Sequence, residues 1–176
     1  MKFYIIAFIL ILLYSCRTEV EKKVEADDTI ILKYAKGFSI EKKDGYKIIT
    51  IKNAWRGENK LQQYVLYKDQ KPKGYGEALK IRIPIKSIAC LSLTHVAFIE
   101  ALGYENTISA ASGCDYTNSE KIKALIQSHK IVEVGEEQSI NYEILVDKKP
   151  SIVMTYGIDE SSMKYINKLT QLGLKT

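Results

Sequence analysis

Residues 88–111 read IACLSLTHVAFIEALGYENTISAA, and this stretch decides the fold class. The apolar run at 88–91 predicts a buried strand, and the second apolar run at 108–111 predicts another. Between them we expect a helix at 94–102, capped at Thr94 and ended by Gly103. The order strand, helix, strand is typical of a βαβ unit, whose two strands lie parallel in one sheet.

The same alternation continues to the end of the chain. A loop at 112–116 leads into a predicted helix over about 118–128, whose apolar residues fall on one face. We then expect, in order, a strand at 131–134, a short helix capped by Asn141, a strand at 151–155, a helix at about 161–172 ended by Gly173, and the start of a strand at 174–176. The fold class expected is α/β, with a parallel sheet flanked by helices.

The region before this sheet, residues 29–86, has a different pattern. Strand-like runs are expected at 30–32, 46–51 and 64–67, and in the alternation of Leu79, Ile81, Ile83 and Ile85. Polar segments with glycine at 43–45 and 73–76 separate these runs and indicate turns. We therefore expect antiparallel β-hairpins that precede the parallel sheet.

The N-terminus has the pattern of a lipoprotein export signal. Lys2 supplies a positive charge, residues 3–13 are almost wholly apolar, and Ser15 stands directly before Cys16. The apolar run is too short to cross a bilayer, which takes about 20 residues. We expect residues 1–15 to be a signal peptide, Cys16 to be lipidated, and residues 16–28 to form a charged tether. An uncleaved anchor is the alternative, and either one holds the domain on the periplasmic side of a bacterial membrane or on the cell surface.

Composition argues against several classes of partner and site. The net charge is +5, and Lys and Glu are mixed along the chain rather than gathered in a basic stripe, which disfavours nucleic acid. His95 and His129 lie far apart in sequence, so we expect no metal site and no cofactor. Cys90 falls in an apolar strand and Cys114 in a polar loop; an exported protein permits a disulfide between them, but these settings disfavour it.

Three segments carry a resemblance to a known family. They are LSLTHVAFIEALG at 91–103, VEVG at 132–135 followed by SINYE at 139–143, and KPSIVMTYG at 149–157. In this order and spacing they resemble the substrate-binding lipoproteins of ATP-driven (ABC) importers for iron-siderophores and cobalamin. The resemblance covers roughly residues 86–176, and the hairpin region is also similar, more weakly, to the lead-in of such lipoproteins from Bacteroidetes-type bacteria.

This resemblance implies a fold and a function. Family members have two α/β lobes joined by a rigid helix, and they hold their ligand in the cleft between the lobes. Residues 87–176 would be the N-terminal lobe, incomplete at its C-terminal end; a natural one-lobe protein is the alternative. The implied ligand is a ferric siderophore, a corrinoid or haem, and the implied partner is an ABC permease in the membrane. A lone lobe is expected to fold but to bind weakly or not at all, because a cleft divides its contacts between two walls.

In an open parallel sheet, ligands bind beyond the carboxyl ends of the strands. The candidate loops are therefore 92–95, 112–116, 136–139 and 156–158, and the resemblance implies contacts at the same loops. The candidate ligand-binding residues are Thr94, His95, Ser112, Tyr116, Glu137 and Tyr156.

Each of these side chains also has an ordinary interpretation. His95 either donates to an anionic chelate or simply occupies the first turn of its helix without contacting ligand. Tyr116 and Tyr156 either contact a planar ligand or pack half-buried in their loops. Glu137 stands where the resemblance would place a stacking aromatic in a cobalamin binder, so its carboxylate disfavours a corrin. Trp55 is expected to pack in the core or rim of the hairpin region.

Glu143 matches the acidic residue with which family members dock onto arginines of the permease. A carboxylate in the first turn of a surface helix is favoured by the helix dipole and can pair bidentately with arginine. The alternative is a glutamate that only stabilises its own helix. Docking would also require the matching glutamate of a second lobe.

Two other classes of function remain as alternatives: an uncharacterised exported enzyme and a surface interaction lipoprotein. The chain has no GxSxG elbow, no HExxH pair and no glycine-rich phosphate loop. Carboxylates occur at Asp115, Glu136, Glu137 and Asp159, but their spacing does not require a catalytic pair. We therefore expect a binding protein rather than an enzyme.

Overall fold

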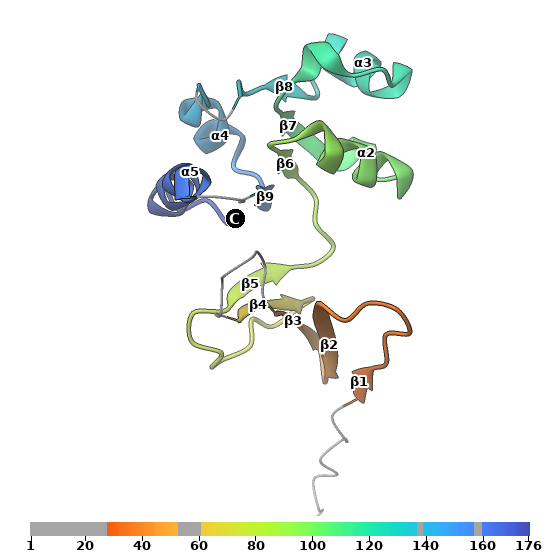
Figure 1. Cartoon of the computed structure of the whole chain (residues 1–176), viewed down its shortest axis with the longest axis vertical. Helices are drawn as coiled ribbons and strands as arrows, with labels where there is room; N and C mark the ends of the chain where they lie inside the picture. The colour runs from red at the N-terminus through yellow and green to blue at the C-terminus, as the bar shows by residue number, and fades with distance from the viewer. Residues whose placement is uncertain (1–27, 53–60, 137–138, 157–159) are drawn as a thin grey trace, which may run out of the picture.

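The computed structural model describes residues 28–52, 61–136, 139–156 and 160–176. Two sheets follow one another along the chain, a five-stranded sheet in the order β1-β2-β3-β4-β5 and a four-stranded sheet in the order β8-β7-β6-β9 (Figure 1). The expected signal peptide, Cys16, nearly all of the tether, and Trp55 lie outside the described residues.

The four-stranded sheet is parallel throughout, as the sequence predicts. It consists of β6 (Ile88–Cys90), β7 (Ile108–Ala111), β8 (Val132–Glu133) and β9 (Ile152–Met154). Every residue of β6 is buried, because β6 is a central strand covered on both faces. The α/β fold class, with a helix-flanked parallel sheet, is confirmed.

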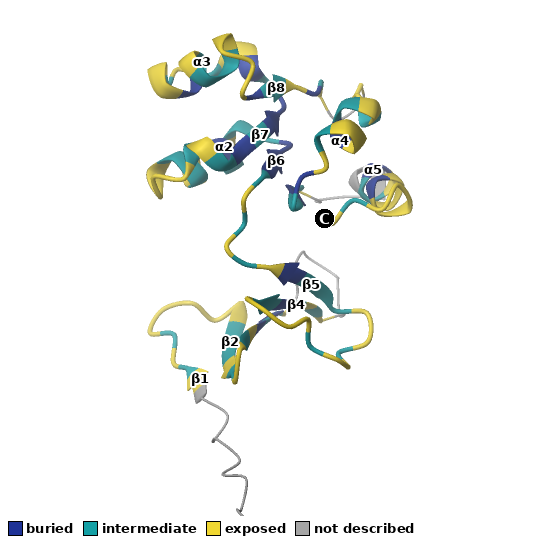
Figure 2. Ribbon diagram, turned by 180° about the vertical axis from the view of Figure 1, so that it is seen from behind, coloured by how far each residue is buried: buried dark blue, intermediate teal, exposed yellow. Residues whose placement is uncertain are grey.

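Helices cover both faces of this sheet (Figure 1). α2 (Leu93–Ala101) and α3 (Glu120–Gln127) lie on one side, and α4 (Tyr142–Lys148) and α5 (Glu160–Gln171) lie on the other. Alternate residues of β6 enter two separate cores: Ile88 and Cys90 pack with α2 and α3, whereas Ala89 packs with α4 and α5. Figure 2 shows the resulting pattern, with buried strands at the centre and exposed residues on the outer faces of the helices.

The helix boundaries agree with the sequence to within two residues, but the N-cap of α2 differs from the predicted one. Its N-cap is Ser92, whose side chain accepts a hydrogen bond from the Thr94 N–H, so the predicted cap at Thr94 is wrong. Both residue types cap well, and the one that ends the extended strand backbone takes the role. The predicted cap at Asn141 and the left-handed Gly103 after α2 are confirmed. Residues 174–176 form no strand, although the Val153 N–H donates to the Lys175 carbonyl at 2.7 Å beside β9.

The five-stranded sheet contains one strand that we did not expect. Its members are β1 (Asp28–Ile30), β2 (Phe38–Lys43), β3 (Tyr46–Ile51), β4 (Gln62–Tyr67) and β5 (Leu79–Arg82). The apolar pattern does not reveal β2, because four of its six residues are charged or polar. β1 to β4 pair antiparallel, and this part of the hairpin prediction is confirmed.

β5 corrects the prediction, because it pairs with β4 in parallel, with Tyr64 opposite Leu79. The segment at 73–76 is therefore not a hairpin turn but part of a longer connection, which returns the chain to the start of β4. Tyr75 anchors this connection to β3 through a 2.7 Å hydrogen bond between its hydroxyl and that of Tyr46. β5 ends at Arg82, before Ile83 and Ile85, since Pro84 has no N–H to continue a ladder.

The two cysteines of the described residues, Cys90 and Cys114, are both free and buried. Burial raises the pKa of each thiol to about 12, and for Cys114 the neighbouring Glu133 adds to the effect. Both thiols therefore stay protonated near neutral pH.

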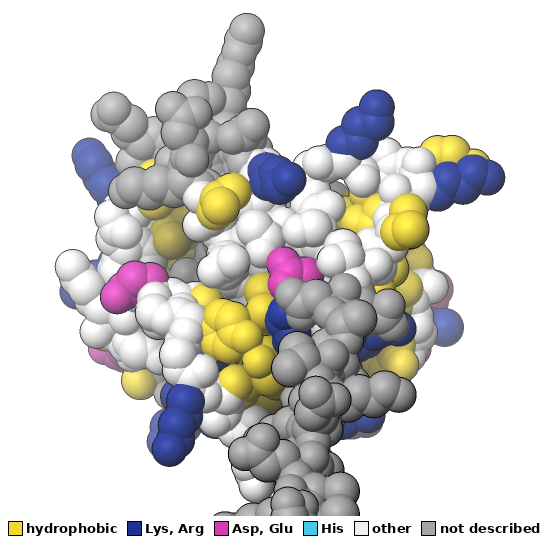
Figure 3. Space-filling model, turned by 90° about the horizontal axis from the view of Figure 1, so that it is seen from below, with side chains coloured by type: hydrophobic (Ala, Val, Ile, Leu, Met, Phe, Trp, Pro, Cys, Tyr) yellow, Lys and Arg dark blue, Asp and Glu magenta, His cyan; other side chains and the backbone are white. Residues whose placement is uncertain are grey.

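The outer surface has two further features. Figure 3 looks onto the five-stranded sheet from below, and its Lys and Arg side chains are scattered around the view instead of forming one patch. Within the described part of the chain, no helix is both long and apolar enough to cross a membrane.

Candidate functional site

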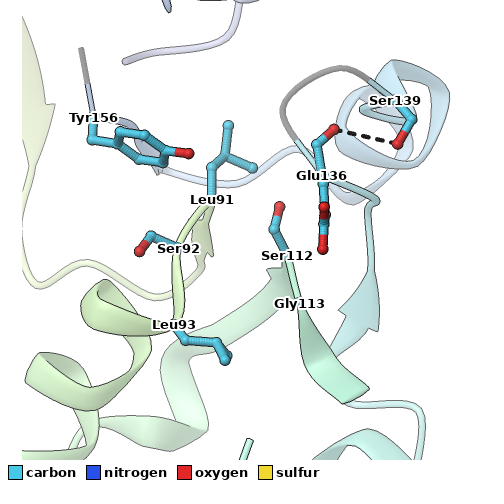
Figure 4. Close-up of a pocket in the computed structure, with 8 residues that line it drawn as sticks. All are labelled: Leu91, Ser92, Leu93, Ser112, Gly113, Glu136, Ser139 and Tyr156. Atoms are coloured by element: carbon cyan, nitrogen blue, oxygen red, sulfur yellow. Dashed lines mark hydrogen bonds between the residues drawn. The ribbon is translucent and has the colours of Figure 1, made fainter. Parts of the chain in front are cut away.

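A pocket of about 750 Å³ lies beyond the carboxyl ends of the parallel strands (Figure 4). Each strand contributes to it through the segment that follows. The lining residues are Leu91, Ser92 and Leu93 after β6, Ser112 and Gly113 after β7, Glu136 and Ser139 after β8, and Tyr156 after β9. Four loops that are distant in sequence thus meet at one edge of the sheet.

Ser112 supplies a polar group without a partner at the base of this pocket. Its backbone N–H donates to the Cys90 carbonyl at 3.0 Å, which extends the ladder between β6 and β7 by one bond. The residue is only 7% exposed, and its hydroxyl oxygen has no hydrogen-bond partner. A buried polar group in this condition costs free energy that a bound ligand would recover.

Tyr156 forms the opposite side of the pocket. Its carbonyl accepts a hydrogen bond from the Tyr165 hydroxyl, which ties the end of β9 to α5. Its side chain is 38% exposed, and Figure 4 shows the ring directed towards Leu91 across the space between the loops. An exposed aromatic face with a hydroxyl at its tip can both stack and hydrogen-bond.

Hydrogen bonds hold the two described parts of the loop after β8 close together. Gly135 adopts a left-handed backbone with φ of 80°, and a Cβ placed there would come within 2.4 Å of the Ser139 carbonyl oxygen. The Ser139 N–H donates to the Glu136 carbonyl at 2.7 Å, and the Asn141 N–H donates to the Val134 carbonyl at the same distance. Glu136 and Ser139, which lie on either side of this contact, both line the pocket.

Glu133, the last residue of β8, bridges two of these loops. Its carboxylate accepts backbone N–H bonds from Gly113 at 3.2 Å, from Cys114 at 2.6 Å and from Gly135 at 2.8 Å. The loops after β7 and β8 are therefore fixed to each other by a single charged side chain.

The predicted site residues divide into two groups. Ser112 and Tyr156 line the pocket. Thr94, His95 and Tyr116 are not among its lining residues, and Tyr116 is 71% exposed. Glu137 lies outside the described residues.

His95 instead packs against the end of β9. Burial lowers its pKa, and a hydrogen bond to the Met154 backbone opposes this shift only in part. Its Nδ1 atom is buried without a partner. The imidazole is therefore neutral near pH 7 and supplies no positive charge to the pocket.

The sequence identified the pocket loops but not all of the residues in them. Leu91, Ser92, Leu93, Gly113, Glu136 and Ser139 are the additional lining residues. Ser92, Leu93, Glu136 and Ser139 carry no spacing signal of their own. The rule that the strand ends meet at one edge of the sheet nevertheless placed their loops together. Glu133 was missed because its role depends on the conformation of two glycine-containing turns.

A second hollow of about 880 Å³ lies between the two sheets. It is lined from one side by residues of β4, β5 and their connection, including Tyr64 and Tyr75, and from the other by Tyr156, Met163 and Ile166. Tyr156 therefore borders both hollows. Across the described ranges, no cluster of three or more His, Cys, Asp or Glu side chains is arranged to hold a metal ion.

Glu143 lies on a different surface, at the exposed start of α4. The Asn141 side-chain oxygen accepts hydrogen bonds from the N–H groups of Glu143 and Ile144 at 3.1 and 3.2 Å, which fixes the first turn of the helix. A shallow, mainly apolar hollow adjoins it, lined by Tyr142, Glu143, Val146, Asp147, Lys149 and Leu172. The carboxylate is thus accessible to a partner beside apolar surface.

Comparison with models of known protein families gave no match, and comparison with curated proteins gave none at the similarity required.

Proposed function

We propose that this domain is the ligand-capturing N-terminal lobe of a substrate-binding lipoprotein of an ABC importer. Its cargo is an iron-siderophore or a related chelate, with cobalamin and haem as further candidates. Lipidated Cys16 would tether the domain outside the cytoplasm. The proposal rests on the site described above together with the resemblance of three sequence segments.

One observation carries the proposal: all four strand-end loops of the parallel sheet line a single pocket, with the buried, unpartnered Ser112 hydroxyl at its base. Ligands of open α/β sheets bind at this edge. The volume of about 750 Å³ is in the range that holds a drug-sized ligand, which also suits an iron chelate. The lining supplies hydroxyl groups and an aromatic ring, which suit recognition of a polar ligand better than chemical attack on it.

Delivery to a permease is supported by Glu143. Its side chain is exposed in the first turn of α4, where the helix dipole favours a carboxylate. The adjoining apolar hollow would add contact area around an ion pair with an arginine.

The proposal is tested by calorimetric titration of residues 17–176 with ferric chelates, haem and cobalamin. We expect weak, saturable binding of at least one of them, because the pocket is open and its lining comes from one side. Tyr156→Ala should weaken that binding by on the order of tenfold, the loss expected for one stacking contact of about 1 kcal/mol or more.

Tyr116→Ala is the matched control, because Tyr116 is an exposed loop tyrosine outside the pocket lining. It should bind as the parent does. Equal loss in both tyrosine variants, or no binding of any of the compounds, would argue against ligand capture at this pocket.

A further inference from the structure

The backbone N–H groups at the carboxyl edge of the sheet are already occupied. Those of Gly113, Cys114 and Gly135 all point at the Glu133 carboxylate, at 2.6 to 3.2 Å. Gly113 and Gly135 both have left-handed backbones, with φ of 73° and 80°, which turn their N–H groups to the same point. Convergent N–H groups of this kind form an anion-binding concavity.

The location of this concavity matters for ligand choice. It belongs to the loops after β7 and β8, and Gly113 also lines the pocket. In an open α/β sheet, these N–H groups would be the natural partners for a negatively charged ligand group. Here the Glu133 carboxylate takes the place of such a ligand group. Because it belongs to the same chain, it is always within reach of these N–H groups.

The rest of the pocket offers hydroxyl groups but no positive charge to an anion. The charged side chain among its described lining residues is Glu136, and the others are Ser92, Ser112, Ser139 and Tyr156 together with apolar residues and glycine. Neither Lys nor Arg occurs among these described lining residues. An anionic group in the pocket would meet repulsion from Glu136, and to reach the N–H groups of the cluster it would have to displace the Glu133 carboxylate from them.

We propose that Glu133 acts as an internal anion, which fills the N–H cluster and restricts the pocket to neutral or cationic ligands. Among ferric chelates, it would admit neutral complexes of the hydroxamate class and exclude strongly anionic complexes of the catecholate class. The ligand preference rests on the proposed function, since it assumes that the pocket binds a chelate. The occupation of the N–H cluster does not depend on that assumption.

The N–H cluster is tested with inorganic phosphate, followed through the amide resonances of Gly113, Cys114 and Gly135 in ¹H–¹⁵N spectra of residues 17–176. In Glu133→Ala, the freed N–H groups should bind phosphate with saturable shifts at these amides. The affinity should exceed that of the parent by on the order of tenfold or more, as expected when charge-assisted hydrogen bonds become available. Glu136→Gln is the control, because it removes a nearby charge but leaves Glu133 in place.

A second variant covers the case in which Glu133→Ala does not fold. Glu133→Gln keeps a side-chain acceptor for the loop amides while it removes the charge, and it too should bind phosphate more tightly than the parent. Equal phosphate shifts in the parent and in a folded Glu133 variant, or none at these amides in either, would overturn the proposal.

The ligand preference is tested separately with a neutral ferric tris-hydroxamate and an anionic ferric tris-catecholate. The parent should bind the first and not the second. Equal binding, or preference for the catecholate, would overturn the inferred ligand class. If neither binds, the proposed function fails together with this preference, whereas the phosphate titration still decides the role of Glu133.

Discussion

Gly135 shows how one backbone position can hold the pocket together. Its left-handed conformation points its own N–H at Glu133, and its missing Cβ leaves room for the Ser139 carbonyl oxygen, which would otherwise lie 2.4 Å away. Any side chain at this position therefore has both an unfavourable φ and a direct clash with backbone.

We expect Gly135→Ala to destabilise the domain by more than about 2 kcal/mol, because the cost of the left-handed backbone, about 1 kcal/mol, and the clash add. Gly45→Ala is the matched control: Gly45 has a nearly identical φ of 79°, but nothing lies within 4 Å of its Cβ position. It should lose only about 1 kcal/mol. Urea unfolding followed by circular dichroism measures both, and equal losses would show that the contact with Ser139 does not matter.

The sequence predicted the loops that form the pocket better than it predicted the individual side chains that line it. Ser112 directly follows β7 and Tyr156 is the second residue after β9, so the prediction for them needed only the strand ends. Thr94 and His95 lie on a helix, where each residue turns the side-chain direction by about 100°. Because α2 is capped at Ser92, two residues earlier than expected, the pocket receives Ser92 and Leu93 instead.

Among the elements, α4 depends most clearly on its cap. The Asn141 side chain accepts hydrogen bonds from two N–H groups of the first turn, and α4 spans only Tyr142–Lys148. So short a helix has little stability of its own, and both the cap and Leu145, which is fully buried in the core, hold it in place.

Asn141→Ala should therefore lower the free energy of unfolding by about 1 kcal/mol, the usual value of an N-cap. Asn118→Ala is the control, since Asn118 is exposed and α3 is capped by Ser119. It should change stability by less than about 0.5 kcal/mol. Thermal unfolding of the two variants and the parent measures the difference. If Asn141→Ala has the same free energy of unfolding as the parent, packing alone fixes α4.

Element types were predictable where the local pattern sufficed. The strands of the parallel sheet are short apolar runs bounded by caps and glycines, and β7 occupies the predicted residues 108–111. The direction in which β5 pairs was not predictable, because it depends on the path of residues 68–78 and on the contact between Tyr46 and Tyr75 across the sheet. Such long-range contacts leave no periodic signal in the sequence.

For the molecule as a whole, the two sheets have separate roles. The parallel sheet carries the pocket, whereas the five-stranded sheet meets it near β5, where the Lys175 ammonium donates to the Lys80 carbonyl at 3.1 Å. The pocket lies open beyond the strand ends, and its lining comes from the parallel-sheet unit alone. A ligand would therefore contact this domain on one side, which explains why we expect weak binding.

The proposed function requires that ligand binds at the strand-end pocket. The most direct measurement is a ¹H–¹⁵N chemical-shift map of residues 17–176 titrated with a neutral gallium tris-hydroxamate, a diamagnetic substitute for the iron complex that reveals even weak binding. We expect saturable shifts concentrated at Leu91 to Leu93, Ser112, Gly113, Ser139 and Tyr156. Shifts confined to the five-stranded sheet, or no shifts at the pocket amides at any concentration, would contradict it.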